Sequence, residues 1–200
     1  MNTQHILDTD DPYKTFAAWL AEAKASEIND ANAMNLATAD AKGRPSNRMV
    51  LLNGLDERGF VFFTNIKSHK GRDLTENPYA ALCFHWKSLL RQVRIEGRVE
   101  QTSLAEADAY YNSRPRVSRI GSWASQQSRP LEKYEDLQDA VKKYEAQFEG
   151  VEPIPRPDYW RGFRVVPDLF EFWIEGDFRL HRRYVFQLEN GAWQRYMINP

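Results

Sequence analysis

Apolar and polar residues alternate along much of the chain with a period of two, the pattern of strands that have one buried face. In residues 91–101, for example, Val93, Ile95 and Val99 alternate with polar side chains. Short runs of this kind, rich in β-branched and aromatic residues, are separated by turns that contain Gly, Asp or Pro. The pattern predicts strands over residues 34–39, 46–53, 59–65, 79–86, 91–101, 163–174, 178–188 and 192–198.

Four segments carry helical patterns instead. The first extends from Pro12 to Ala25, with an Asp before Pro12 as the cap and with Phe16, Leu20 and Ala23 on one stripe. The others cover residues 68–77, 103–113 and 131–149. Helices collected at the start and in the middle predict an antiparallel β-barrel with flanking helices rather than alternating βαβ units. We expect residues 1–200 to form a single domain, with residues 1–10 as a flexible N-terminal tail.

Composition narrows the classes of partner. The chain has 200 residues, of which 42% are hydrophobic, enough to bury a sizeable core without disulfides. Lys and Arg total 27 against 28 Asp and Glu, so the net charge of −1 gives no general attraction to nucleic acid or to an anionic membrane. No apolar run approaches the ~20 residues that span a bilayer. We expect a cytoplasmic protein with no nucleic-acid or membrane partner, in which Cys83, the only cysteine, is a buried core thiol.

Positive charge nevertheless gathers in three places. The two-residue period of the strand predicted from residue 178 places Arg179, His181 and Arg183 on one face. Residues 67–72, KSHKGR, surround an expected helix N-terminus that Ser68 could cap, where backbone N–H groups favour phosphate. Residues 113–130, SRPRVSRIGSWASQQSRP, contain four arginines and five serines. Each cluster is compatible with an anionic ligand and also with plain solvation. The four histidines show no metal-ligand spacing, and no metal is expected.

Six motifs then occur in a specific order: RMVLL, GFVFFTN, SHKGRDL, RQVRIEGRVE, YYNSRPRVSRIGSWASQQS and EFWIEGDFRLHRR. In this combination the chain resembles the pyridoxamine 5′-phosphate oxidases from about residue 11 to residue 200. The resemblance implies an FMN-binding split β-barrel and a homodimer with FMN at the subunit interface. It further implies oxidation of pyridoxamine or pyridoxine 5′-phosphate to pyridoxal 5′-phosphate, with hydride passing to FMN and O₂ reduced to H₂O₂.

The resemblance also assigns roles to single residues. For FMN these are Arg48, Phe63, Thr64, His69, Lys70, Gln92, Gln127, Ser128, Trp173 and Arg183. For the substrate they are Asn53, Tyr110, Arg114, Ser118, Arg179 and His181. Of these, Arg179 and His181 would be catalytic and face the pyridine ring, and the substrate's proton would leave through His181 or water. Arg116, Arg119 and Arg129 receive no ligand and are expected to be solvated or to contact a second subunit.

Four positions depart from the family pattern. Asn53 stands where Lys is usual, Phe63 where Tyr is common, His69 where Arg is common, and Arg182 where Asp would follow the histidine. A neutral amide in place of a cation predicts weaker phosphate binding or a different substrate. The alternatives are therefore another flavin oxidoreductase on the same barrel and a non-catalytic protein that binds FMN or pyridoxal phosphate. An RNA-binding module is disfavoured because the net charge is near zero and no RNP-like aromatic motif is present.

Overall fold

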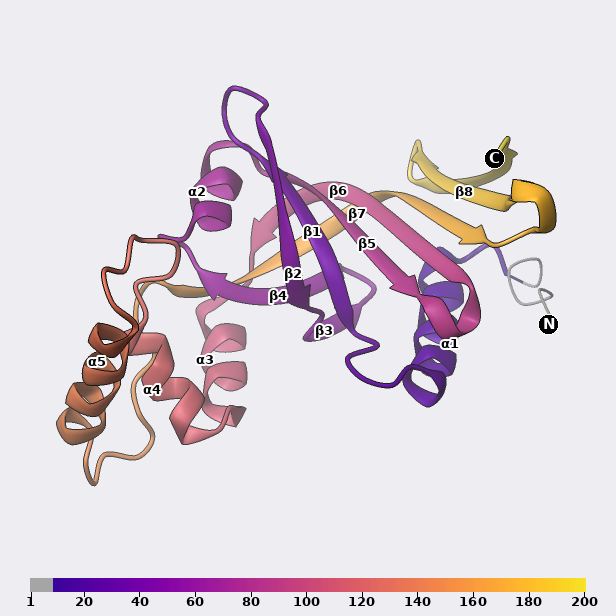
Figure 1. Ribbon diagram of the computed structural model, residues 1–200. Coiled ribbons are helices and arrows are strands. Elements are labelled where there is room, and N and C mark those ends of the chain that lie inside the picture. The colour runs from indigo at the N-terminus through magenta and orange to yellow at the C-terminus, as the bar shows by residue number, and fades with distance from the viewer. Residues whose placement is uncertain (1–8) are drawn as a thin grey trace.

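The computed structural model describes residues 9–200, so most of the expected N-terminal tail lies outside the described residues. Within that range, nine strands form one sheet in which every paired neighbour is antiparallel (Figure 1). The strands are β1 (Ala33–Ala39), β2 (Pro45–Leu51), β3 (Gly54–Asp56), β4 (Gly59–Asn65), β5 (Tyr79–Trp86), β6 (Arg91–Gln101), β7 (Trp160–Ile174), β8 (Arg182–Glu189) and β9 (Ala192–Ile198). The helices are α1 (Pro12–Ser26), α2 (His69–Glu76), α3 (Leu104–Ser113), α4 (Arg116–Ala124) and α5 (Tyr134–Gln147).

Strand β7 is the longest of these strands, with 15 residues. One of its edges pairs with β6 over most of its length, and the other pairs first with β4 and then with β8. The order β2-β1-β5-β6-β7-β4-β3 bends at a bulge between Glu96 and Gly97. A Cβ on Gly97 would lie 2.1 Å from the Val166 carbonyl oxygen, so the close approach of the two strands requires glycine there. The result is a curled half-barrel with β8 and β9 extending from one end (Figure 1).

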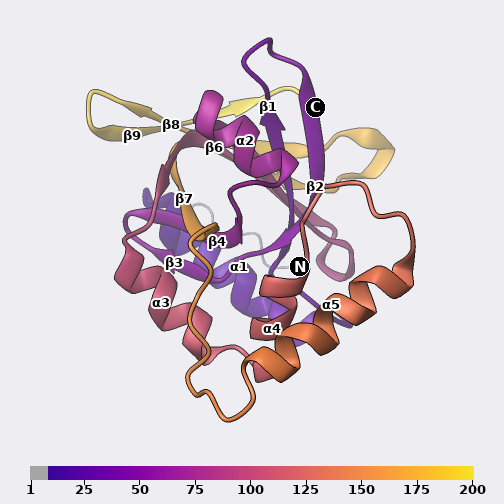
Figure 2. The same ribbon diagram turned by 90° about the vertical axis from the view of Figure 1, so that its left-hand side faces the viewer.

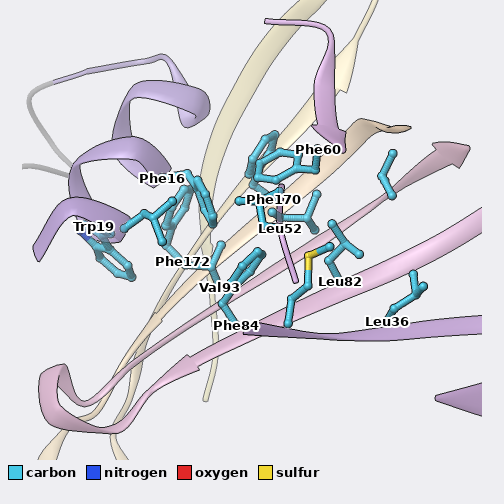
Figure 3. Packing of buried hydrophobic residues seen from close by; sticks show 14 of the residues in the cluster. Phe16, Trp19, Leu36, Leu52, Phe60, Leu82, Phe84, Val93, Phe170 and Phe172 are labelled. Atoms are coloured by element: carbon cyan, nitrogen blue, oxygen red, sulfur yellow. The ribbon is translucent and has the colours of Figure 1, made fainter. Parts of the chain in front are cut away.

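The core lies between the curled sheet and α1. Asp11 caps this helix by accepting the N–H groups of Tyr13 and Lys14. The Phe16 ring of α1 lies 4.9 Å from both Phe60 and Phe84, measured between ring centroids, and Trp19 contacts Phe172 in the same cluster (Figure 3). Edge-to-face aromatic contacts of this kind fix α1 on the sheet.

The remaining helices gather at the other end of the sheet (Figure 1), and Figure 2 shows α3, α4 and α5 in front of the strands. Helix α3 begins with a capping box between Ser103 and Glu106. Helix α4, which the sequence pattern did not predict, packs near the end of α5, where Ile120 clusters with Phe148, the residue after α5, and with Ile154 of the following loop. None of the helices in residues 9–200 is both long enough and apolar enough to cross a lipid bilayer.

Most predicted elements are confirmed, but the strand expected from residue 178 and the burial of Cys83 are not. The strand expected from residue 178 begins at Arg182, because residues Asp177–Arg179 form a 3-10 turn in which Phe178 and Arg179 have φ of 54° and 66°. The turn is needed because β8 reverses direction to pair with β7. The expected row of Arg179, His181 and Arg183 on one strand face is therefore absent. Cys83 is half-buried rather than buried, because it lies on the face of β5 opposite to the one that Leu82 and Phe84 give to the core.

The aromatic core predicts a large cost for truncating Phe172, which is fully buried against Trp19 and Phe186. We expect Phe172→Ala to lower the free energy of unfolding by about 3–5 kcal/mol, measured by urea unfolding followed by circular dichroism. The exposed Tyr134 in α5 is the control, and Tyr134→Ala should change that value by no more than about 0.5 kcal/mol. Equal effects of the two substitutions would contradict the assignment of the core.

Candidate active site

A cavity of about 510 Å³ opens between β2, β4, α3 and α4. Eight residues assigned to cofactor or substrate from the sequence line it: Asn53, Phe63, Thr64, Lys70, Tyr110, Arg114, Ser118 and Gln127. The structure thus brings together side chains from distant parts of the sequence, from β2 to the segment that follows α4.

Lys70 supplies a buried cation at one end of this cavity. Its ammonium donates to Thr64 Oγ1 at 3.3 Å and to Gln127 Oε1 at 3.5 Å, and no carboxylate in residues 9–200 forms an ion pair with it. Burial and, secondly, the nearby charge of Arg48 lower the pKa of Lys70. The charge is desolvated without a counter-ion, which is the condition that an anionic ligand relieves.

Arg48 on β2 is held beside Lys70 by hydroxyl groups. Its guanidinium donates to Thr38 Oγ1 at 2.7 Å and to Ser46, and both hydroxyls also donate to the buried Asp73 carboxylate. Asp73 Oδ2 lies 3.9 Å from the guanidinium, so it orients Arg48 mainly through these two hydroxyls. Burial lowers the pKa of Arg48 as well.

Helix α2 carries Lys70 and begins as expected, because Ser68 accepts the N–H of Gly71. A Cβ on Gly71 would lie 2.4 Å from the Ile66 carbonyl oxygen, so glycine lets the helix approach the preceding loop. His69 is more than half exposed and faces Asp73, with Nε2 3.5 Å from Oδ1. It does not line the cavity, and neither does the exposed Ser128 beyond Gln127.

At the other end of the cavity, three aromatic rings lie nearly parallel to one another. The Phe63 ring lies 4.2 Å from Tyr110 and 5.1 Å from Trp160, and these two lie 6.1 Å apart, measured between ring centroids. Tyr110 and Trp160 are too close together to lie on opposite faces of Phe63, so they lie side by side over one of its faces. Arg114 places its guanidinium 5.1 Å from the centre of the Trp160 ring, and Asn53 Nδ2 donates to the Tyr110 hydroxyl oxygen at 2.6 Å.

Arg114 is the second cation of the cavity that lacks a carboxylate partner within the described residues. Its Nη1 donates to Ser122 Oγ at 2.8 Å, and burial lowers its pKa. Sequence reasoning missed both Ser122 and Trp160. A helix predicted over residues 116–124 would have revealed Ser122, because it lies four residues after Ser118 on the same face.

Arg116 and Arg119, which were left without a ligand, pair within the chain instead of being solvated. Both form ion pairs with Glu152, and Arg116 also donates to the carbonyl oxygens of Phe148 and Val151. These contacts fasten the segment after α5 to α4.

The other predicted site residues form a second group, at the far end of β7. Gln92 pairs with Trp173 across the sheet, and the Trp173 ring lies 4.5 Å from the His181 ring. Trp160 lines the cavity, and Trp173 follows it by 13 residues on the same strand. The cavity lining of one chain includes none of the residues Gln92, Trp173, Arg179, His181 and Arg183.

Within this second group, Arg183 is paired and Arg179 is not. Arg183 Nε donates to Glu171 Oε1 at 2.7 Å, and this hydrogen bond raises the pKa of Arg183. Arg179 is exposed and makes no hydrogen bond or ion pair with the described residues. The Gly176 N–H donates to His181 Nδ1 at 3.2 Å, so a neutral His181 carries its proton on Nε2.

Comparison with known proteins settles the family. A family model described as "Pyridoxamine 5′-phosphate oxidase" matches residues 20–148, and one described as "Pyridoxine 5′-phosphate oxidase C-terminal dimerisation region" matches residues 160–200. The chain belongs to the pyridoxamine 5′-phosphate oxidase family. It is therefore an oxidoreductase, as its sequence motifs implied.

Named relatives of the same family align with nearly the whole chain. The pyridoxine/pyridoxamine 5′-phosphate oxidase of Mesorhizobium japonicum is 54% identical and aligns with 100% of this chain and 98% of its own. That of Azorhizobium caulinodans is 55% identical over 96% of this chain and 91% of its own. PhzG from Burkholderia lata, solved with tetrahydrophenazine-1-carboxylic acid, superposes with a TM-score of 0.93 at 30% identity and covers 100% and 98% of the two chains. The split-barrel fold expected for a pyridoxamine 5′-phosphate oxidase is thus confirmed.

The uncompensated charge of Lys70 predicts opposite effects on stability and on binding. Since burial places the pKa of folded Lys70 below its unfolded value, the protonated form destabilises the fold at neutral pH, and this penalty fades as pH rises through the folded pKa. We expect Lys70→Met to raise the free energy of unfolding of the ligand-free protein at pH 7 and to weaken phosphate binding about ten-fold or more. Urea unfolding and isothermal titration calorimetry with inorganic phosphate measure the two effects.

The control for Lys70→Met is the same change at the exposed Lys42 in the β1–β2 turn, which should affect neither quantity. Lower stability of the Lys70→Met protein together with unaltered phosphate binding would contradict the assignment of Lys70 to an anion site.

Proposed function

We propose that this protein oxidises pyridoxamine 5′-phosphate or pyridoxine 5′-phosphate to pyridoxal 5′-phosphate with FMN as its cofactor. One observation carries the proposal. A single cavity holds a buried cation, Lys70, and a half-buried one, Arg114, neither of which has a carboxylate partner in residues 9–200. The cofactor and the substrate of such a reaction each bring one phosphate group. The names of the relatives support the same substrates.

The end of the cavity near α2 fits the phosphate of FMN. Lys70 lines this end, and the partly desolvated Arg48 lies beside Lys70, outside the lining. Thr64 and Gln127 offer a hydroxyl and an amide for the flavin ring. When bound, FMN supplies the acceptor for the hydride that leaves the substrate carbon, and O₂ then reoxidises the flavin with formation of H₂O₂.

The opposite end fits the phosphate of the substrate. Arg114 offers a charge-assisted grip, and the hydroxyls of Tyr110 and Ser118 line the same wall. The ring stack of Phe63, Tyr110 and Trp160 gives this wall a flat apolar surface beside the expected position of the pyridine ring.

A second copy of the chain completes the site in this proposal. The five residues at the far end of β7 do not line the cavity of their own chain. Four of them lie within the matched dimerisation region, and the fifth, Gln92, pairs with Trp173 in that region. A homodimer therefore forms two sites, each with Lys70 and Arg114 from one subunit and Arg179 and His181 from the other.

Arg179 and His181 would then act on the substrate ring. The exposed guanidinium of Arg179 is available to a ligand. His181, with its proton on Nε2, donates a hydrogen bond to the substrate and does not accept a proton there. The amine or hydroxyl proton of the substrate then leaves to water. Arg183 supports the site as half of an ion pair with Glu171, so part of its charge is already neutralised.

The decisive test of function is turnover. We expect purified protein to take up FMN with a flavin absorption spectrum and, with pyridoxamine 5′-phosphate in air, to form pyridoxal phosphate and H₂O₂ in equal amounts. A site shared between two subunits also allows a more specific test. Lys70→Met and Arg179→Ala should each abolish turnover, and subunit exchange between the two variants should restore about a quarter of wild-type activity.

The outcomes of this test separate the alternatives. Bound flavin without product would favour a different substrate or a non-catalytic binder. No flavin uptake at all would overturn the proposal. Failure of the mixed variants to regain activity, with each variant folded and dimeric, would contradict the site shared between subunits.

The tautomer of His181 predicts how much turnover remains when glutamine or asparagine replaces it. The Nε2 atom of a glutamine occupies about the position of histidine Nε2, so His181→Gln should keep more turnover than His181→Asn, by about five-fold or more. The pH profiles of kcat for both variants should match that of the wild type. If the pH profile of kcat lost its acidic or its basic limb in both variants, His181 would be shown to transfer the proton.

A further inference from the structure

We propose that Asn53 is a positioning residue that acts through Tyr110 and does not itself hold the ligand. Its amide binds the phenol oxygen and leaves the hydroxyl proton of Tyr110 free to donate to the anionic group beside Arg114. The inference rests on the proposed function and adds to it a determinant of specificity for the phosphorylated end of the substrate.

The hydrogen bond between the two side chains is the first step of the argument. Asn53 follows β2, and its backbone N–H donates to the Val61 carbonyl oxygen at 2.8 Å, which fixes where its side chain begins. Its Nδ2 donates to Tyr110 Oη at 2.6 Å. A phenol has one proton to donate, and an oxygen that already accepts from an amide keeps that proton for another acceptor.

The ring stack gives the second step. Tyr110 is half-buried, with its ring parallel to Phe63 within 13° and Phe63 parallel to Trp160 within 7°. The phenol is therefore held at both its ring and its oxygen before any ligand arrives. A preorganised donor costs less conformational entropy on binding than one that must be ordered by the ligand.

Charge gives the third step. Arg114 and Lys70 are the two cations that line the cavity, and Lys70 belongs to the opposite end, beside Thr64 and Gln127. Asn53 is neutral and adds no attraction at long range. What it adds is polarisation, because a hydroxyl that accepts one hydrogen bond donates a stronger one. Its effect on the ligand therefore depends on the hydroxyl group of Tyr110.

A double-mutant cycle tests this dependence. The variants are Asn53→Ala, Tyr110→Phe and both together, each loaded with FMN, and the probes are inorganic phosphate and pyridoxal 5′-phosphate in isothermal titration calorimetry. We expect Asn53→Ala to weaken binding about five-fold when Tyr110 is present and less than about two-fold when Phe replaces it. In turnover, the substitution should raise KM for the phosphorylated substrate about five-fold and change kcat less than about two-fold.

Ser118→Ala is the matched control, because Ser118 lines the same cavity and forms no hydrogen bond with Tyr110. Ser118→Ala should weaken phosphate binding by the same factor whether position 110 is Tyr or Phe. If Asn53→Ala lowers the melting temperature, Asn53→Leu, which is closer in size, replaces it in the cycle.

Each outcome has a definite meaning. Equal losses from Asn53→Ala in both backgrounds would show that Asn53 contacts the ligand directly and would overturn the inference. Absence of phosphate binding to the wild type would overturn it too. Coupling between Asn53 and Tyr110 in a protein that does not turn over B6 phosphates would support the inference and refute the proposed function. Turnover without coupling would do the reverse.

Discussion

The pairing of β7 is the constraint on which the rest of the structure depends. This strand is hydrogen-bonded to β6 along one edge and to β4 and β8 in succession along the other. It therefore joins the half-barrel to the β8–β9 hairpin and ends beside the cavity at Trp160 and beside His181 at Trp173. The two groups of predicted site residues lie at opposite ends of this strand, so the proposed reaction needs a second subunit to bring them together.

The buried and half-buried cations of residues 9–200 are of two kinds, those paired with carboxylates and those without such partners. Outside the cavity, arginines pair with carboxylates, as with Arg183 and Glu171, or Arg119 and Glu152. On the cavity side, Lys70 and Arg114 are desolvated without that neutralisation. Burying a cation without a partner opposes folding, and the proposed anionic ligands would relieve that cost at both positions. The contrast supports the proposed site from electrostatics, independently of any motif.

The sequence predicted the strands well where apolar alternation coincided with a buried face, as in β6 and β7. It failed where local pattern and tertiary constraint disagree. Residues 178–186 alternate like a strand, yet the return of the chain from β7 to β8 requires a turn at Phe178 and Arg179. Helix α4 was missed because its buried Arg119 is stabilised by Glu152, more than 30 residues away, which no local window contains.

The candidate site divides in the same way. The motifs named eight residues that line one cavity, but they could not show that Asn53 faces Tyr110 or that Tyr110 and Trp160 lie over one face of Phe63. Trp160 was missed because nothing in its local sequence distinguishes it from a core tryptophan. These are properties of three-dimensional contact between segments about 50 or more residues apart, and only the fold reveals them.

The turn at Asp177–Arg179 determines whether the chain loses conformational entropy there on folding or on ligand binding. Two successive residues other than glycine are held there in the left-handed region, and a Cβ on Gly176 would lie 2.1 Å from the Leu180 carbonyl oxygen. Such a backbone persists only where its surroundings impose it. The segment that carries Arg179 is thus immobilised when the chain folds. A ligand that meets this guanidinium has only its side-chain torsions left to restrict, so most of the ordering has taken place during folding, before any molecule binds.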